Sequence, residues 1–163
     1  KLDGEQSIIN SNCKHIIIRT SWLFSEYNNN FFKTMIKLAK TNKEIRVVCD
    51  QYGTPTYAQD LAKAINRIIY KIDSSHIEHG VFHYGGNSIC SWYDFACEIF
   101  KQSMVKIEVQ PVSSEEFKAM AIRPTNSSLD SNKLVMSYDV VSSDWRKGIS
   151  EALKKVKKFK IMA

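Results

Sequence analysis

Short apolar stretches bounded by polar residues occur at four places in the chain and predict four β-strands. They cover residues 16–18, 44–49, 80–84 and 107–112. The first is a run of three isoleucines without polar alternation, which is typical of a strand buried on both faces of a parallel sheet. Such a strand needs neighbours on both sides, and the rest of the chain offers few. We therefore expect part of the parent sheet to lie outside this sequence.

Apolar residues recur at the three- and four-residue spacing of amphipathic helices in the segments between these strands. This spacing predicts the end of a helix at 8–9, helices over about 30–40 and from 56, 91 and 144, and a helical turn from 113. Thr56 and Ser113 begin capping-box patterns, and Ser91 is a further helix cap. The helix after Thr56 is expected to bury one face, formed by Leu61, Ala64, Ile65, Ile68 and Ile69.

Strands and helices alternate along the chain, and this order predicts an α/β fold. No repeat and no low-complexity segment divides the sequence. We expect one α/β unit over residues 1–163, lacking some of the parent sheet.

The net charge of +6 raises the question of a nucleic-acid partner. Much of the excess lies in lysines of the last predicted helix, namely Lys147, Lys154, Lys155, Lys157, Lys158 and Lys160. No aromatic residues are interleaved with them for base stacking. We interpret them as a solvated helix face and predict no nucleic-acid partner, although the positive potential also suits a nucleotide diphosphate.

The lengths of the apolar runs and the spacing of the cysteines indicate whether the chain contacts a membrane and in which compartment it is found. No apolar run approaches the about 18 residues that span a bilayer, and the first residues contain no signal-peptide core. Cys13, Cys49, Cys90 and Cys97 form no CxxC motif and no zinc-type spacing. These features predict reduced thiols, no membrane contact and a cytoplasmic location.

Several kinds of chemistry are disfavoured by the residues themselves. The chain has six glycines and neither a GxGxxG nor a GxxGxxG pattern, so it should not bind NADPH tightly alone. No Gly-x-Ser-x-Gly elbow of a serine hydrolase is present. His76, His79 and His83 are irregularly placed, and we predict no metal site.

Polar side chains follow the strand predicted at 16–18, at the end where α/β proteins bind ligands. Thr20 and Ser21 either contact a ligand there or form a strand-end turn, and Trp22 either lines the site or joins the core. The Gln51 side-chain amide either hydrogen-bonds a sugar or a pyrophosphate, or stabilises the turn in which Gln51 lies. Arg123 precedes a proline and suits bidentate binding of a phosphate, or ties its loop to a helix C-terminus.

Eight segments together carry a family resemblance. They are Lys1-Leu2-x-Gly4-Glu5, Arg19-Thr20-Ser21-Trp22-Leu23-Phe24, Asn30-Phe31, Asp50-Gln51-Tyr52-Gly53-Thr54-Pro55-Thr56, Gly80-Val81-Phe82-His83-Tyr84, Ser91-Trp92-Tyr93-Asp94-Phe95-Ala96, Arg123-Pro124-x-Asn126-Ser127-x-Leu129-Asp130 and Asp144-Trp145-Arg146-x-Gly148. In order and spacing they resemble the dTDP-4-dehydrorhamnose reductases of the extended short-chain dehydrogenase/reductase superfamily. The resemblance implies the C-terminal, substrate-binding lobe of an NAD(P)-binding Rossmann-type reductase with residual parallel strands, without the N-terminal cofactor-binding half.

The resemblance assigns three residues to catalysis and the cofactor. Lys1 corresponds to the lysine of the family's Tyr-x-x-x-Lys motif, which contacts the nicotinamide ribose of NADPH. Its ammonium lowers the pKa of the motif tyrosine, which protonates the substrate carbonyl while hydride arrives at the carbonyl carbon. Thr20 and Ser21 are placed by the same resemblance near the nicotinamide amide.

Four further residues are assigned to the substrate. Trp22 is expected beside the sugar, and Gln51 is expected to bind the sugar or the pyrophosphate. Arg123 and Asn126 belong to the segment that family members use against the dTDP moiety.

The implied activity is reduction of dTDP-4-dehydro-6-deoxy-L-mannose by NADPH to dTDP-L-rhamnose, with the isolated chain inactive. One alternative is a non-catalytic relative like the regulatory subunit of methionine adenosyltransferase, which shares the Gly-x-Phe-His and Arg-Pro-x-Asn segments. Another is a reductase of a different nucleotide-deoxysugar. An exposed parallel strand also predicts that the isolated chain forms homodimers or aggregates.

Overall fold

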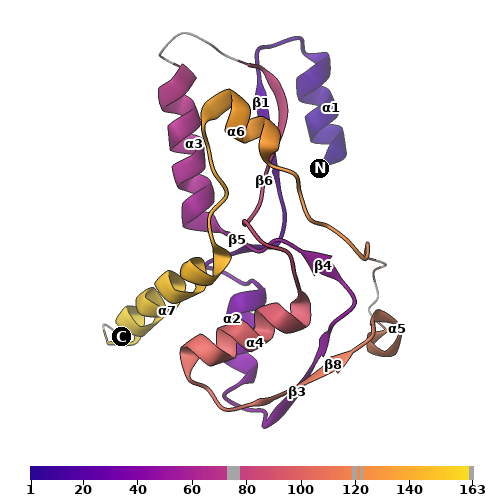
Figure 1. Cartoon of the computed structure of the whole chain (residues 1–163), viewed down its shortest axis with the longest axis vertical. Helices are drawn as coiled ribbons and strands as arrows, with labels where there is room; N and C mark the ends of the chain where they lie inside the picture. Colours follow the sequence, from indigo (N-terminus) through magenta and orange to yellow (C-terminus); the bar gives the residue numbers. More distant parts are fainter. Residues whose placement is uncertain (73–77, 119–120, 122, 162–163) are drawn as a thin grey trace.

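A computed structural model describes residues 1–72, 78–118, 121 and 123–161. Within these residues the strands form three parallel pairs and one antiparallel pair, connected mainly through helices. The predicted α/β class is therefore confirmed. Figure 1 shows one group of elements around β1 and β6 and a second around α2, α4, β3 and β8, with β4 and β5 between them.

The first group is built on two parallel strands, β1 (Ile16–Thr20) and β6 (Gly80–Tyr84). The helices around them are α1 (Leu2–Asn10), α3 (Ala58–Ile72) and α6 (Asn132–Tyr138). A small core joins α3, β6 and α6, and Ile16 and Ile18 pack against it. Its buried members are Ala64, Ile68, Phe82, Tyr84, Leu134, Tyr138 and Val140.

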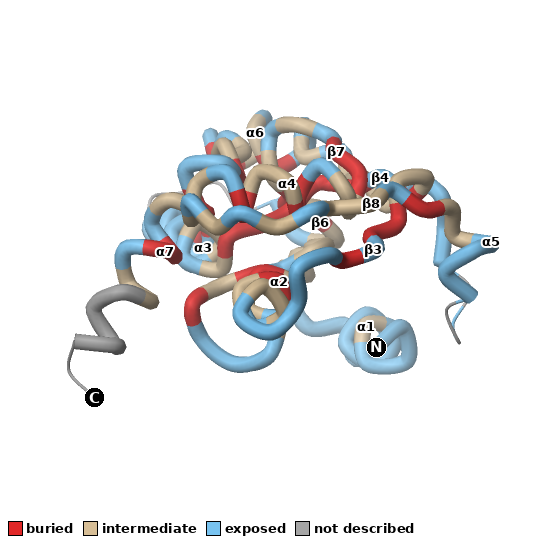
Figure 2. The backbone as a smooth tube through the Cα atoms, turned by 90° about the horizontal axis from the view of Figure 1, so that it is seen from below, coloured by how far each residue is buried: buried red, intermediate tan, exposed pale blue. Residues whose placement is uncertain are grey.

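The expectation that residues 16–18 form a strand buried on both faces is not met in this chain. Ile16, Ile17 and Ile18 are only half-buried, because among the described residues β1 is paired on one edge alone, with β6. Figure 2 shows α1 as a mostly exposed helix apart from the body, and no α1 residue is buried. The helix is tied to β1 by Glu5, which accepts hydrogen bonds from Arg19 Nε at 2.9 Å and Nη2 at 2.6 Å.

Two details predicted for α3 are wrong. Thr56 does not cap the helix, because it lies in β5 (Thr56–Tyr57), where it pairs with Leu23 of β2 (Leu23–Phe24). The strand pairing keeps this backbone extended, so the helix begins at Ala58. The buried face is also narrower than expected, since Ile65 and Ile69 remain 39% and 54% exposed.

The second group contains most of the remaining elements. They are α2 (Phe31–Leu38), β3 (Glu44–Val48), β7 (Cys90–Ser91), α4 (Trp92–Ser103), β8 (Glu108–Val112), α5 (Ser114–Phe117) and α7 (Trp145–Ile161), and β4 (Tyr52–Gly53) between the two groups pairs with β7. Strands β3 and β8 are parallel, whereas β4 and β7 are antiparallel. The core here is aromatic: Phe95 contacts Phe24, Phe31 and Trp145 at ring-centroid distances of 5.2–5.5 Å.

Side-chain caps fix where three helices of this group begin. Asn30 caps α2, and Ser91 and Ser113 form full capping boxes on α4 and α5. The caps predicted at Ser91 and Ser113 are confirmed. The Ser91 cap has a functional consequence, because it sets the position of Trp92, the first residue of α4.

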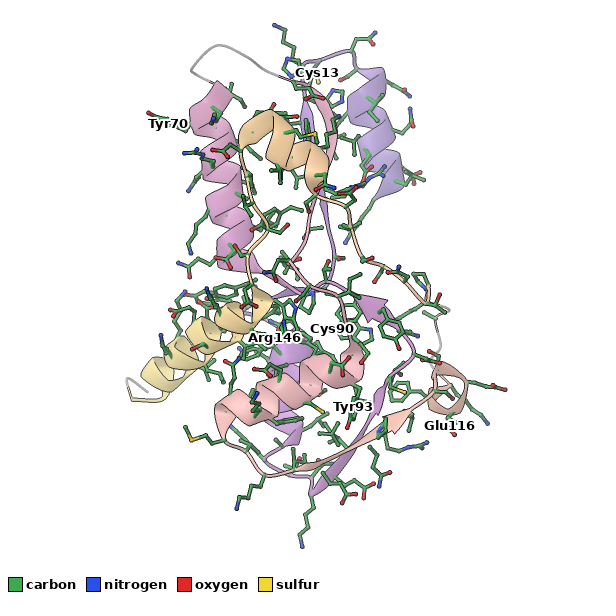
Figure 3. The ribbon with its side chains drawn as sticks, in the orientation of Figure 1. Cys13, Tyr70, Cys90, Tyr93, Glu116 and Arg146 are labelled. Atoms are coloured by element: carbon green, nitrogen blue, oxygen red, sulfur yellow. The ribbon has the colours of Figure 1, made fainter. Side chains whose placement is uncertain are left out.

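All four cysteines are free thiols in the structure. Figure 3 shows Cys13 at the α1 end of the molecule and Cys90 beside the start of α4, far from each other. Burial raises the pKa of Cys90 to about 12, with the nearby Asp94 carboxylate acting in the same direction.

In the described part of the chain, no helix is long and apolar enough to cross a membrane.

Candidate functional site

Two stacked indole rings form one wall of the candidate site. Trp22 follows the carboxyl end of β1, and its ring lies parallel to that of Trp92, with centroids 3.5 Å apart and planes 9° apart. Trp92 is held by the capped start of α4. The two rings are thus brought together by a strand end and a helix start that are 70 positions apart in sequence.

A hydrogen-bonded loop forms the opposite side. Tyr52 N donates to the Thr125 carbonyl at 2.7 Å, and Ser127 N donates to the Tyr52 carbonyl at 2.9 Å. These bonds add the 125–127 segment to β4 as a short parallel bridge. Arg123 and Pro124, which directly precede this segment, line the pocket. The indole N–H of Trp22 then donates to Ser127 Oγ at 2.9 Å and connects the two sides.

These elements enclose an open pocket of about 300 Å³. It is lined by Trp22, Gln51, Trp92, Arg123, Pro124 and Ser127. The combination of flat aromatic surface, a side-chain amide and a guanidinium suits a ligand that carries both a ring and an anionic group.

Gln51 is placed by a polar network at the start of α5. Its side chain is 7% exposed, and Nε2 donates to Ser114 Oγ at 2.8 Å. Ser114 in turn donates from its hydroxyl and its backbone N–H to Asp50. The Ser114 hydroxyl, followed by its backbone N–H, lowers the pKa of Asp50 below its ordinary value. The carboxylate therefore anchors the loop that presents Gln51.

A second, more apolar pocket of about 480 Å³ adjoins the first. Gln51, Trp92 and Arg123 line both of them. Its other walls come from α2, β3 and α5, and include Phe31, Met35, Leu38, Val47, Val48 and Phe117. Arg123 thus stands between an aromatic pocket and an apolar groove, where one elongated ligand with a central anionic group could occupy both.

The structure brings together three of the predicted site residues: Trp22, Gln51 and Arg123. Asn126 belongs to the same loop, but its Oδ1 accepts from the backbone N–H and the hydroxyl of Ser128 and it does not line the pocket. Three lining residues were not predicted as site residues: Trp92, Pro124 and Ser127. Trp92 was interpreted as a core residue from its helical spacing, and Ser127 gave no signal except its place in the family segment.

The residues predicted for the cofactor do not line this pocket. Lys1 is an exposed residue at the start of α1, and Ser21 Oγ donates to the Thr54 carbonyl at 3.4 Å. Thr20 ends β1, and its Oγ1 is buried without a hydrogen-bond partner. Such an orphan is rare and fits a contact that is completed by a bound group. The roles of Lys1, Thr20 and Ser21 stay predictions.

Metal ligation has no candidate among the described residues, where no group of three or more His, Cys, Asp or Glu side chains could hold an ion. Of the three histidines considered from the sequence, His76 lies outside the described residues.

Comparison with known proteins identifies the family. The family model of the RmlD substrate binding domain matches residues 1–158. A dTDP-4-dehydrorhamnose reductase of Aggregatibacter actinomycetemcomitans is 38% identical over 156 residues, which cover 91% of this chain and 53% of the relative. The spore coat polysaccharide biosynthesis protein SpsK of Bacillus subtilis is 37% identical, covering 92% and 50%. The chain spans about half the length of these curated relatives.

Solved structures give the same result. A dTDP-4-dehydrorhamnose reductase from Bacillus anthracis, crystallised with NADP, superposes with a TM-score of 0.87 at 40% identity over 95% of this chain and 53% of that one. One from Clostridium acetobutylicum gives a TM-score of 0.88 at 39% identity, covering 96% and 54%. A UDP-glucuronic acid 4-epimerase from Bacillus cereus, at 16% identity, shares the fold alone. The chain therefore belongs to the RmlD substrate binding domain family.

Proposed function

We propose that this chain is the sugar-nucleotide-binding part of an NADPH-dependent reductase that converts dTDP-4-dehydro-6-deoxy-L-mannose to dTDP-L-rhamnose. The observation that carries the proposal is the position of Arg123 between the pocket of Trp22 and Trp92 and the adjoining apolar groove. A sugar nucleotide has the matching order of parts, with a pyrophosphate between a sugar and a base. The names of the relatives support this substrate over that of another deoxysugar reductase and over a non-catalytic regulatory role.

In the proposed complex the guanidinium of Arg123 pairs with pyrophosphate oxygens, and the flat surface of Trp22 packs against the sugar. The base enters the apolar groove. Gln51, fixed by Ser114, either exchanges hydrogen bonds with sugar hydroxyls or donates to the pyrophosphate. Asn126 contributes by shaping the loop that carries Arg123.

NADPH, when bound to the parent enzyme, supplies hydride to the substrate carbonyl. Lys1, Thr20 and Ser21 are the residues of this chain that would meet its nicotinamide end, and the buried, unpaired Oγ1 of Thr20 supports such a contact. The pyrophosphate of the cofactor needs a glycine-rich turn that the sequence does not contain. We therefore propose that the chain binds dTDP-sugars, and that tight NADPH binding and turnover require the N-terminal half of a reductase. We also propose that the parent enzyme is cytoplasmic.

Calorimetric titration with dTDP tests this proposal. The wild-type chain should bind dTDP, and Arg123→Ala should weaken binding about 10- to 100-fold, as expected for loss of a charge-assisted pair. Arg67→Ala is the matched control, because Arg67 lies on α3 and pairs with Asp139 away from the pocket. Equal affinities of the two variants would contradict the proposed role of Arg123.

Self-association of the isolated chain is also proposed. The edge of β1 that is unpaired among the described residues, together with the exposed Ile65 and Ile69 of α3, supports it. Sedimentation at increasing concentration should show dimers or larger species, and a monomer at all concentrations would refute it.

A further inference from the structure

The backbone of Trp22 adopts a conformation that a bulky residue rarely takes. Its φ is +48°, in the left-handed region. A non-glycine residue held there is strained and persists only when its surroundings fix it. Here the Trp22 carbonyl accepts from Thr56 N at 3.2 Å, which ties the strained backbone to β5. The side chain must be fixed separately.

Contacts from three directions fix the indole ring. Trp92 stacks on it, and Ser127 accepts its N–H at 2.9 Å. Gly53 passes so close that an added Cβ would lie 2.5 Å from Trp22 Cε2 and 2.8 Å from Ser127 Oγ. Only glycine therefore permits this approach of β4 to the ring.

The hydrogen-bond directions at Ser127 are determined by its partners. An indole N–H can only donate, so Ser127 Oγ must accept from Trp22. The hydroxyl proton is then directed to the Tyr52 carbonyl, 3.1 Å from Oγ. Ser127 N also donates to that carbonyl. One side chain thus connects the Trp22 ring, strand β4 and the loop that carries Arg123.

We propose that Ser127 is a positioning residue, which holds the Trp22 indole against Trp92 in the orientation that contacts the sugar of a dTDP-sugar. This inference rests on the proposed function, and it assigns to Ser127, which also lines the pocket, a role in sugar binding that acts through the orientation of Trp22. Replacing Ser127 by alanine removes the acceptor and frees the ring to turn, without altering Arg123 or the groove.

The test combines a ligand-free spectrum with two ligands. Closely stacked tryptophans give an exciton couplet in the circular dichroism spectrum, and Trp92→Phe identifies the band by abolishing it. Ser127→Ala should reduce the couplet and weaken dTDP-glucose about fivefold, the effect of one ordinary hydrogen bond, while dTDP affinity changes by less than about twofold. Ser128→Ala is the matched control, because its hydroxyl donates to Asn126 and its side chain does not line the pocket.

A double-mutant cycle separates positioning from a general structural effect. Trp22→Phe retains an aromatic ring but has no N–H, so adding Ser127→Ala to it should cause no further loss of dTDP-glucose affinity. An unchanged couplet in Ser127→Ala would overturn the proposal, and so would equal weakening of dTDP and dTDP-glucose. If the wild-type chain binds neither ligand, the proposed function fails, while the couplet still decides whether Ser127 orients the ring.

Discussion

The C-terminal helix α7 packs into the core and also forms an ion pair with a buried glutamate, whose loss should have a measurable cost. Lys155 Nζ lies 2.8 Å from Glu26 Oε1 and also donates to Tyr57 OH at 3.1 Å and to Gln59 Oε1 at 2.8 Å. The Glu26 side chain is 2% exposed and that of Lys155 is 33% exposed. The variant Lys155→Met keeps the alkyl stem and removes the charge, so Glu26 keeps Tyr57 as a side-chain donor but loses its cation.

The magnitude follows from this burial. Breaking a fully buried pair costs about 3–5 kcal/mol. Water can reach the place of the Lys155 ammonium, so we expect a loss of about 2 kcal/mol in the free energy of unfolding. Lys154→Met is the matched control on the same helix, because its pair with Glu151 is 66% and 52% exposed. It should cost less than about 0.5 kcal/mol. Urea unfolding of both variants measures the difference.

The effect should depend on pH through Glu26. Burial, the largest single influence, raises the pKa of Glu26, but hydrogen bonds from Lys155, its own backbone and Tyr57 together hold it below the ordinary value. A carboxyl with a depressed folded-state pKa contributes stability above its unfolded pKa of about 4.3, and this is lost as the pH falls through the folded-state pKa. The stability gap between wild type and Lys155→Met should therefore close in acid.

Either of two results would refute this reasoning. Lys155→Met and Lys154→Met could cost the same, or the gap at neutral pH could persist unchanged when Glu26 is protonated. Adding Glu26→Gln to Lys155→Met should recover part of the loss, because no buried charge is then left alone.

Three further predictions concern the site, the core and the thiols. Gly53→Ala should displace the Trp22 indole and weaken dTDP-glucose binding about tenfold, because the ring loses its contact with the sugar. Gly4→Ala in α1 is the control, since a Cβ there meets nothing within 4 Å, and it should leave binding unchanged in the same titration. Phe95→Ala empties a position that is 0% exposed and should lower the free energy of unfolding by about 3–5 kcal/mol in urea; a cost below about 1 kcal/mol would contradict the packing. The buried Cys90, with its pKa of about 12, should resist iodoacetamide in the folded chain while the exposed Cys13 reacts, as mass spectrometry would show, and equal labelling would contradict its burial.

The sequence predicted the longer elements because each has its own periodicity or cap. The helix after Ser91 is an example, since a capping serine precedes apolar residues at helical spacing. The two-residue strands β2, β4, β5 and β7 carry no periodicity and could not be seen. Thr56 shows the consequence: a local capping pattern was overridden by pairing with Leu23, a contact 33 positions away. Helix α6, with its buried Leu134 and Tyr138, was also missed.

The candidate site was predictable only in part, for a similar reason. Arg123 and Gln51 are polar residues in loops, where binding groups are expected, and Trp22 follows a strand end. Trp92 repeats at the spacing of core residues, and only its tertiary contact with Trp22 shows that it lines a pocket. Burial of the isoleucines in β1 was overestimated, because an uninterrupted apolar run predicts neighbours on both sides, whereas among the described residues β1 pairs on one edge only.

Parallel calorimetric titrations of the isolated wild-type chain with dTDP and with NADPH test the central claim most directly. The claim is that this chain holds the sugar-nucleotide site of a reductase and lacks the pyrophosphate cradle of the cofactor. We expect saturable binding of dTDP, and no saturation by NADPH at the same concentrations. Binding of NADPH as tight as that of dTDP, or of NADPH alone, would contradict the account.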